Sequence, residues 1–121
     1  MKNIFNDSSN PLVVLEVANN HQGDLEHGLK IINEFGNISD NYSNDFTFAF
    51  KFQYRKLKTF IHKDSLDSEI KYVKRFLETK LEQDEWKALI KRVQELNFLT
   101  MCTPFDEESV DRVIQDNFQI L

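Results

Sequence analysis

Four polar residues have the type and the position to do chemistry, since they lie near the ends of apolar runs: Glu16, Lys51, Gln53 and Thr103. In parallel α/β folds the carboxyl ends of the strands build the active site. Lys51 can bind a phosphate or a carboxylate as a point charge. Glu16 stands inside an apolar run, where a carboxylate is costly unless it is paired, and Lys51 is the obvious partner. The residues alone leave a functional pair and a purely structural ion pair equally open.

The apolar runs that carry these residues have the pattern of β-strands and span residues 12–18, 46–53 and 98–103. The second run (FTFAFKFQ) alternates strictly, so four phenylalanines share one face while small and polar residues share the other. The phenylalanine face suits packing against helices, and the other face suits a barrel lumen with functional groups at its mouth. An antiparallel strand with one solvated face is the alternative. We favour the lumen, because solvated faces more often carry several long polar side chains.

Helical spacing predicts helices between these strands. The first begins after an N-cap at Asp24 and stops at Gly36, and a polar loop fills residues 37–45. The second is amphipathic, covers residues 84–96 and ends at Asn97.

The other segments complete the alternation. Residues 55–80 form a long charged connection with a helical turn or two near residues 70–77. Residues 118–121 begin a fourth strand. A third helix is N-capped by Asp106, and its buried side is predicted to carry Val110, Val113 and Ile114.

The order β-α-β-α-β-α-β indicates a parallel sheet in an α/β fold. The chain stops inside an apolar strand, where a parallel sheet would expose a hydrophobic edge. We therefore expect residues 1–121 to be a partial barrel domain truncated in the fourth strand. Three and a half βα units in 121 residues extrapolate to about 280 for eight, the size of a (β/α)8 TIM barrel. The predicted fold is the N-terminal portion of such a barrel.

Motifs along nearly the whole chain resemble the sialic acid synthase family. Residues 16–24 (EVANNHQGD) are similar to its first motif, a strand ending in Glu and followed by an Asn-His-x-Gly-Asp loop. Residues 51–53 (KFQ) resemble its second-strand motif, and residues 79–81 (TKL) resemble the lead-in to its long helix. Residues 103–110 (TPFDEESV) resemble its third-strand motif and the helix that follows. Their order and spacing together make the resemblance specific.

The resemblance implies an N-acetylneuraminate synthase-like transferase. Such enzymes condense phosphoenolpyruvate with N-acetylmannosamine or a related N-acylated amino sugar, giving a nonulosonic acid and phosphate. The resemblance implies that Lys51 and Thr103 hold the phosphate and that Gln53 helps to orient the sugar. Glu16 would be the catalytic carboxylate, near the carbon where the tetrahedral intermediate forms. In the family a divalent metal, Mn or Mg, polarises the sugar aldehyde. Its histidine ligands lie on later strands, so we expect no metal bound by this fragment.

The same resemblance implies that the C-terminal half-barrel and an antifreeze-like cap domain are absent here. The cap completes the neighbouring subunit's site, so the full-length form would be a domain-swapped homodimer and the fragment by itself would be inactive. Two features depart from the family pattern. The segment 37–45 is longer and more polar than expected, and Glu82-Gln83 replaces a Ser or Thr helix cap. They leave the choice of amino sugar open.

Three other interpretations compete with this one. A receiver-type signalling module needs an acidic pair after the first strand and an Asp ending the third. Residues 19–21 (NNH) and 103–105 (TPF) stand there instead, which excludes it. Another phosphoenolpyruvate-condensing barrel, such as a 3-deoxy sugar-acid phosphate synthase, shares the chemistry but not this combination of motifs. A non-catalytic remnant is the third alternative.

Composition limits the classes of molecule that the protein is expected to bind and the compartment in which it is expected to work. The formal net charge of −5 disfavours nucleic acids and anionic membranes. No apolar stretch approaches the length of a membrane span, and residues 1–10 lack the apolar run of a signal peptide. A lone cysteine, Cys102, is typical of a reducing compartment, so we expect a cytoplasmic protein.

Several residues have a simpler structural interpretation beside any functional one. His21, in the motif loop, either shapes the site or packs with backbone hydrogen bonds. We expect His27 and His62 at the surface, Trp86 in the core and Cys102 against the helices as a buried thiol.

Overall fold

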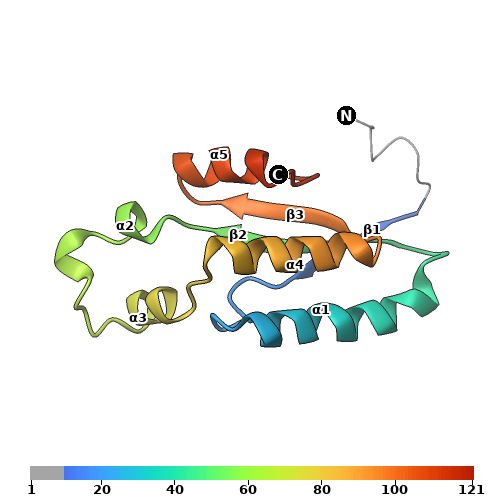
Figure 1. Ribbon diagram of the computed structural model, residues 1–121, viewed down its shortest axis with the longest axis horizontal. Helices are drawn as coiled ribbons and strands as arrows, with labels where there is room; N and C mark the ends of the chain where they lie inside the picture. The colour runs from blue at the N-terminus through green and yellow to red at the C-terminus, as the bar shows by residue number, and fades with distance from the viewer. Residues whose placement is uncertain (1–9) are drawn as a thin grey trace.

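The structure, a computed structural model, describes residues 10–121. Three parallel strands form one sheet in their order along the chain (Figure 1): β1 (Leu12–Glu16), β2 (Thr47–Tyr54) and β3 (Leu99–Pro104). The predicted parallel α/β sheet is therefore confirmed. The expectation about a signal peptide rests largely on residues 1–9, which lie outside the described residues.

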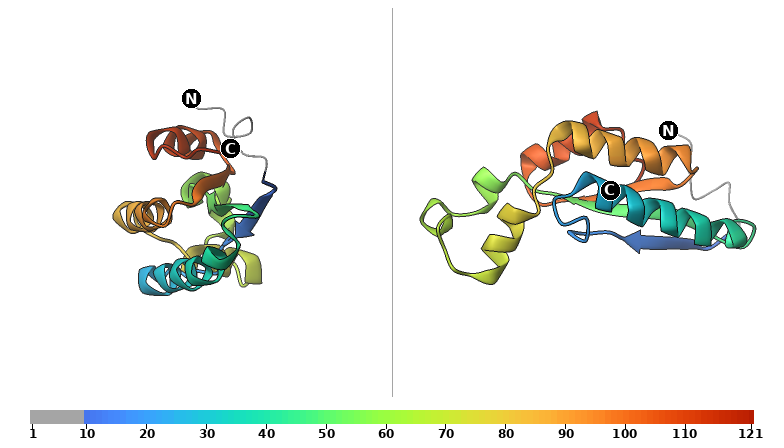
Figure 2. Two further views of the ribbon diagram at one scale, coloured as in Figure 1. Left: turned by 90° about the vertical axis from the view of Figure 1, so that its right-hand side faces the viewer. Right: turned by 60° about the horizontal axis from the view of Figure 1, so that its bottom comes forward.

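The three long helices lie on one face of this sheet (Figure 2): α1 (Leu25–Ser39), α4 (Gln83–Glu95) and α5 (Glu107–Gln115). Phe50 and Phe52 point into this helical layer and are fully buried. Lys51, between them in sequence, belongs to the opposite face, which no helix covers in the described part of the chain. There Val14 of β1 is 41% exposed. The phenylalanine face of the second strand was thus predicted correctly.

An apolar core joins the sheet to the helices. Leu89 and Val93 of α4 pack with Ile32 of α1 and Val113 of α5 around the strand phenylalanines. Each fully buried side chain of this size contributes about 1.5–3 kcal/mol of transfer free energy. Gly28 permits the close approach of α1 to α4, because a Cβ there would lie 2.9 Å from Leu89 Cδ2. This core fixes the strands, and the strands carry the candidate site residues.

The first helix is longer than predicted. Asp24 is its N-cap, as expected, and accepts a hydrogen bond from the His27 backbone N–H at 3.0 Å. Gly36 does not stop the helix, which runs through it to Ser39 and continues as the 3₁₀ turn η1 (Asp40–Tyr42). A Cβ at Gly36 would lie 2.9 Å from Leu96 Cδ1. The glycine therefore serves helix packing, and the expected loop at 37–45 is partly helical.

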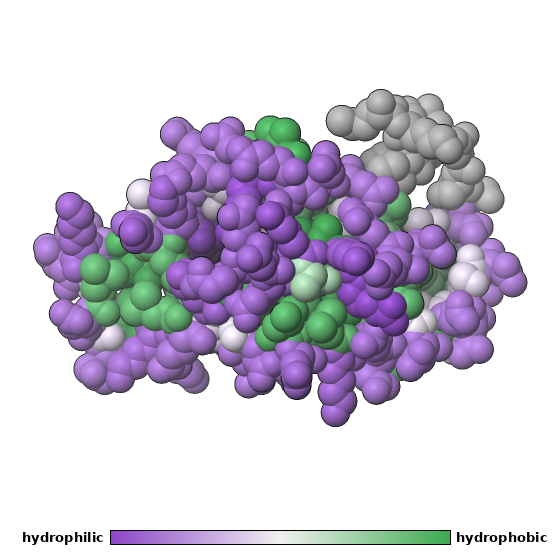
Figure 3. Space-filling view, in the orientation of Figure 1, coloured by the Kyte–Doolittle hydropathy of each residue, from purple (hydrophilic) through white to green (hydrophobic). Residues whose placement is uncertain are grey.

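The long connection after β2 contains three short helical elements: α2 (Leu57–Phe60), the 3₁₀ turn η2 (Lys63–Ser65) and α3 (Lys71–Glu78). Figure 1 shows that it extends beyond the carboxyl ends of the strands. The last of these elements confirms the helical turns predicted near residues 70–77. Figure 3 shows an apolar patch at the left of the molecule, at the end where this connection lies. The partly exposed apolar residues of the connection include Phe60, Leu66, Ile70 and Leu77.

The last helix begins as predicted but buries fewer residues. Asp106 is its N-cap and accepts from the Ser109 backbone N–H at 2.8 Å. Val113 is buried, whereas Val110 is 38% and Ile114 63% exposed. The prediction that both would be buried is wrong, because no described element lies against that side of α5.

The segment after α5 pairs with β3 through a single parallel bridge, Met101 to Ile120, and is not a full strand. The Cys102 N–H donates to the Ile120 carbonyl and the Ile120 N–H donates to the Thr100 carbonyl, each at 3.1 Å. Residues 118–121 thus lie along the outer edge of β3, where the fourth strand was predicted. Within residues 10–121, no helix has the length and apolar character to cross a membrane.

Candidate active site

Glu16 and Lys51 form an ion pair at the carboxyl end of the sheet. They face each other in the register of β1 and β2, and Glu16 Oε2 lies 2.7 Å from Lys51 Nζ. The side chains are 41% and 28% exposed, so the pair is half-buried and open to solvent. The predicted pairing is confirmed. A half-exposed pair tolerates a ligand that competes for one partner, because water can solvate the other.

Gln53 and Thr103 lie beside this pair. They are paired in the parallel register of β2 and β3, two residues further along each strand than the pair of Lys51 and Met101. Because side chains on one face recur every second residue, Lys51, Gln53 and Thr103 share the open face of the sheet. The structure therefore brings together all four residues singled out from the sequence, at the ends of three adjacent strands.

The loop between β1 and α1 turns sharply at the edge of this group. Ala18, Gln22 and Gly23 have φ values of +48°, +57° and +71°, in the left-handed region. The Ala18 N–H donates to Glu16 Oε1 at 3.2 Å, so the turn also orients the carboxylate. A Cβ at Gly23 would lie 2.7 Å from the Glu78 carbonyl oxygen, so this position needs glycine both for its backbone angle and for space.

Arg55 is a polar residue of the site that the sequence analysis did not single out. Its Nη1 donates to Asn19 Oδ1 at 2.9 Å, and its Nη2 donates to the Gln53 side-chain oxygen. The guanidinium carbon lies 4.4 Å from the ring centroid of Phe76 and 4.6 Å from that of Phe105. Stacking between aromatic rings fixes the planar group. Arg55 directly follows β2, and its spacing of two from Gln53 was the available signal, since the alternation of the strand, continued by one residue, places both on one face.

His21 is a buried structural residue of the loop. It is 1% exposed, its Nδ1 accepts from the Gly23 N–H at 3.1 Å, and its ring packs edge-on against Trp86 at 5.2 Å. Burial, with help from the positive charge of Arg55, lowers the pKa of His21 to about 4. It is therefore neutral near pH 7, and of the two interpretations left open the packing role is the one observed. His27 and His62 are exposed, as expected.

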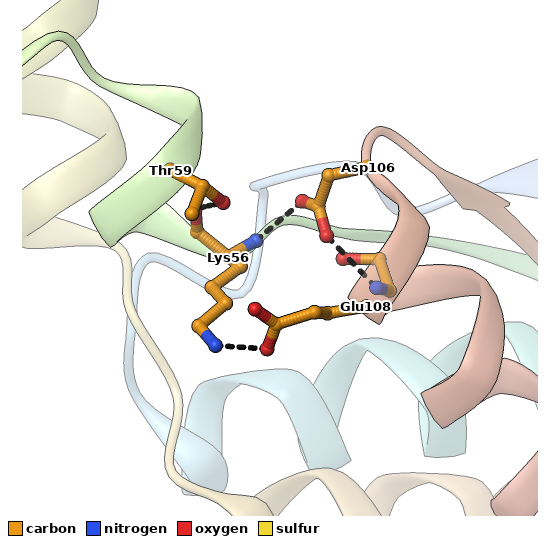
Figure 4. A network of polar contacts seen from close by, with 5 residues as sticks. Lys56, Thr59, Asp106 and Glu108 are labelled. Atoms are coloured by element: carbon orange, nitrogen blue, oxygen red, sulfur yellow. Dashed lines mark hydrogen bonds and ion pairs between the residues drawn. The ribbon is translucent and has the colours of Figure 1, made fainter.

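Asp106 connects the end of β2 to α5 (Figure 4). Its Oδ2 accepts from the Lys56 backbone N–H at 2.7 Å while its Oδ1 caps the helix through Ser109. Lys56 Nζ also contacts Glu108. Burial alone would raise the pKa of Asp106, but the Lys56 and Ser109 N–H groups outweigh it and hold that pKa below its usual value. This junction fixes the chain directly after Gln53.

Cys102 is buried on the helical face, as predicted, and burial raises its thiol pKa to about 12. It is therefore unsuited to act as a nucleophile. Among residues 10–121, no three His, Cys, Asp or Glu side chains gather as a metal site would require. The donors present in the described chain do not fit a divalent metal.

Chemically, the site offers one flexible ammonium, one carboxylate, a carboxamide held by an arginine and a threonine hydroxyl. The ammonium and the hydroxyl suit an anion such as phosphate, and the carboxylate suits a proton or a developing positive charge. These groups converge at the carboxyl ends of parallel strands, where α/β proteins bind small ligands.

Comparison with known proteins finds a family with a similar sequence. A sequence model of the NeuB family matches residues 47–121. No curated protein sequence matches the chain. Among solved structures, a protein from Chromobacterium violaceum assigned as spore coat polysaccharide biosynthesis protein E is 42% identical, with a TM-score of 0.86. The match covers 92% of this chain and 33% of that one.

Two more distant structures share the fold. The N-acetylneuraminic acid synthetase of Leptospira borgpetersenii is 23% identical with a TM-score of 0.69, over 92% of this chain and 35% of that one. A spore coat polysaccharide biosynthesis protein of Bacillus subtilis is 18% identical with a TM-score of 0.60, over 93% and 28%. The chain thus spans about a third of the length of the solved structures that it matches.

Proposed function

Because this chain belongs to the NeuB family, we propose that it forms the first part of the catalytic barrel of a sialic acid synthase-type enzyme. The observation that carries the proposal is the pair of Glu16 and Lys51, 2.7 Å apart at the carboxyl ends of adjacent parallel strands. In a (β/α)8 barrel those ends form the mouth of the active site.

The arrangement of the sheet supports a partial barrel. The strands follow one another in sequence order, the long helices lie on one face, and the opposite face exposes Val14. Residues near Ile120 already pair with the outer edge of β3. Further βα units added at that edge would turn the open face into a lumen. We propose that these units and the antifreeze-like cap lie outside residues 1–121.

The proposed reaction joins phosphoenolpyruvate to an N-acylated amino sugar in its aldehyde form. The methylene carbon of the enol attacks the aldehyde carbon, and the aldehyde oxygen takes up a proton. Water then adds to the cationic carbon that carries the phosphate, giving a tetrahedral intermediate. Its carbon–oxygen bond to phosphate breaks, which leaves a keto acid and inorganic phosphate. The net equation consumes one water and releases one phosphate.

Each site residue has a proposed role in that sequence. Lys51 and the Thr103 hydroxyl bind the phosphate, the former through charge and the latter through a hydrogen bond. Gln53 orients the sugar with its carboxamide nitrogen, because Arg55 already engages its oxygen. Glu16 lies beside Lys51 and accepts a proton from the attacking water or stabilises the cation before water adds.

The family uses a divalent metal, but the described residues do not provide a site for it. We therefore propose that its ligands belong to segments outside this chain, and no step above depends on it. The domain-swapped dimer likewise stays a prediction, since it involves the cap domain.

The test is phosphate release in the full-length polypeptide that carries this chain. We expect release from phosphoenolpyruvate that depends on N-acetylmannosamine or a related acceptor. With ¹⁸O in the bridging position of phosphoenolpyruvate, the label should appear in inorganic phosphate, because the carbon–oxygen bond breaks. Label retained in the organic product would exclude this mechanism. Release with a pentose phosphate but with no amino sugar would indicate a 3-deoxy sugar-acid phosphate synthase instead.

A further inference from the structure

Two carboxamides at the edge of the candidate site are held by the same guanidinium. Arg55 Nη1 donates to Asn19 Oδ1 at 2.9 Å, and Arg55 Nη2 donates to the side-chain oxygen of Gln53. Asn19 belongs to the loop after β1 and Gln53 to the end of β2, so one planar group joins two segments. Of these three residues, the proposed reaction gives a contact with substrate only to Gln53.

The guanidinium is itself fixed in place. Its central carbon lies 4.4 Å from the ring centroid of Phe76 and 4.6 Å from that of Phe105. A planar group packed against two aromatic rings cannot turn freely, and its terminal nitrogens donate in fixed directions. Arg55 can therefore set the orientation of both carboxamides.

This orientation decides which atom of each carboxamide can meet a ligand. A carboxamide carries an accepting oxygen and a donating nitrogen on the same carbon. Because both oxygens are turned toward Arg55, the nitrogens remain to contact a ligand. Within residues 10–121, neither Asn19 Nδ2 nor Gln53 Nε2 has a hydrogen-bond partner.

Both amide nitrogens are open to solvent. The buried side-chain atoms without a partner in the described chain are Arg55 Nε and Arg112 Nη2, and neither amide nitrogen is among them. Asn19 and Gln53 are half-buried, and both line a cavity of about 540 Å³ at the end of β2. A ligand in the candidate site can therefore reach these two donors.

The surroundings of the two donors are positive and apolar. Lys80 lines the same cavity, and Glu108, already paired with Lys56, is the one carboxylate among its described lining residues. Leu81 and Trp86 form part of its apolar wall. An ammonium group is a cation that only donates, so neither the amide nitrogens nor the lysines favour it. An N-acyl group instead offers a carbonyl oxygen to the donors and an alkyl group to the apolar wall.

We infer that Asn19 is a second sugar-binding residue and Arg55 a positioning residue, which together make the site select an N-acylated amino sugar over the free amine. Asn19 and Gln53 donate to the acyl oxygen through their amide nitrogens. Arg55 acts through both residues by holding their oxygens. The inference rests on the proposed function, because it assigns residues to the acceptor sugar of that reaction.

Asn19→Asp separates the donor from the contact that orients it. The aspartate keeps an oxygen for Arg55, but an accepting oxygen replaces the donating nitrogen. In the full-length polypeptide that carries this chain, KM for N-acetylmannosamine should rise about tenfold, whereas KM for phosphoenolpyruvate should stay the same. Mannosamine, measured as a competitive inhibitor, should bind about threefold tighter or more, because its ammonium then meets a carboxylate. A merely structural role for Asn19 would not produce these opposite changes.

Asn33→Asp is the matched control. Asn33 is also half-buried and its Oδ1 accepts from Arg92 Nε at 2.7 Å, but it lies on α1 and does not line the cavity. The same substitution there should change neither KM nor the inhibition by mannosamine.

Arg55→Lys tests the positioning role. A lysine keeps the charge but cannot hold two oxygens with a planar fork. We expect KM for N-acetylmannosamine to rise and the preference over mannosamine to fall, with KM for phosphoenolpyruvate unchanged. Circular dichroism would show whether loss of the stacking disturbs the fold. In that event Asn19→Asp, which retains Arg55, decides the case.

The outcomes separate this inference from the proposed function. Equal effects of Asn19→Asp and Asn33→Asp, or an equal rise of KM for both substrates, would overturn the inference and leave the proposed reaction intact. The same holds if Asn19→Asp binds mannosamine no better than the wild type does. A wild type that uses no N-acylated amino sugar would instead overturn the proposed function, and this inference with it.

Discussion

Glu16 Oε2 lies 2.7 Å from Lys51 Nζ across two adjacent parallel strands, with both side chains partly exposed. Ion pairs of this exposure contribute about 0.2–1 kcal/mol to stability, because solvent screens them and ordering two side chains is costly. Such a small contribution does not explain by itself why a carboxylate and an ammonium occupy these strand ends. The pair is better placed to exchange partners with a ligand.

Lys51→Ala should therefore separate stability from function. We expect the free energy of unfolding to fall by less than about 1 kcal/mol, measured by urea denaturation. In the full-length polypeptide, kcat/KM for phosphoenolpyruvate should fall at least about a hundredfold, because a charged contact to phosphate is lost. Lys91→Ala is the control, since Lys91 also pairs with a carboxylate, Glu95, on an exposed helix face at 3.9 Å. Normal kinetics in Lys51→Ala would show that the phosphate assignment is wrong.

Gly23→Ala and Gly36→Ala should differ strongly in their effect on stability, although an added Cβ would lie too close to a neighbouring atom at both positions. Gly23 has φ +71° and its Cβ would meet the backbone oxygen of Glu78 at 2.7 Å. Neither the positive φ angle nor the position of the carbonyl group can change at a low energetic cost. We therefore expect a loss of about 1–3 kcal/mol in unfolding free energy. At Gly36 the Cβ would meet a flexible Leu96 methyl inside a helix, where alanine is the better helix former. A change within about 1 kcal/mol is expected there. Equal losses measured by thermal unfolding would contradict this account.

These glycines show what the sequence can and cannot predict about the fold. Periodicity located all three strands and the faces of the second one, because alternation in Phe46 to Gln53 is a local property. The same local view placed a helix stop at Gly36. The actual reason for that glycine is a leucine sixty residues later, at the C-cap of α4, and a partner so distant in sequence leaves no local signal. Val110 and Ile114 show the same limit, since helical spacing marks an apolar stripe but not what covers it.

The candidate site, too, could be predicted from the sequence only in part. Glu16, Lys51, Gln53 and Thr103 could be predicted because parallel strands bring their carboxyl ends together whatever the details of packing. Arg55 was missed because its importance depends on Asn19, Phe76 and Phe105, which lie on three other segments.

Asp106→Ala should destabilise the chain more than loss of an ordinary helix cap. One carboxylate serves both the cap of α5 and the backbone N–H of Lys56. We expect a loss of about 1–2 kcal/mol at pH 7, measured by urea denaturation. The folded pKa of Asp106 lies below its usual value, so its contribution is present above pH 4 and is lost as the pH falls through the folded pKa. The difference between the wild type and the variant should therefore shrink below about pH 4.

Asp111→Ala is the control for that variant, because Asp111 is an exposed aspartate in the interior of the same helix. It should change stability by less than about 0.5 kcal/mol, as surface substitutions usually do. A difference between wild type and Asp106→Ala that stays constant from pH 7 to pH 3 would show that the ionised carboxylate is not what stabilises the junction.

His21 should make the stability of the protein depend on pH in a separate, higher window. Its folded pKa is about 4, below the ordinary value of 6.5, so the unfolded chain binds a proton that the folded chain refuses. Stability should then rise with pH between about 4 and 6.5 and be flat above it, as far as this residue is concerned. His21→Gln should flatten the pH dependence in that window, measured as unfolding midpoints at a series of pH values. His62→Gln, at an exposed histidine, should retain it. Because Asp106 acts only below pH 4, the two windows can be told apart in one set of titrations. A wild-type protein equally stable at pH 4.5 and pH 7 would mean that protonated His21 is accommodated, and that its packing against Trp86 does not require the neutral ring.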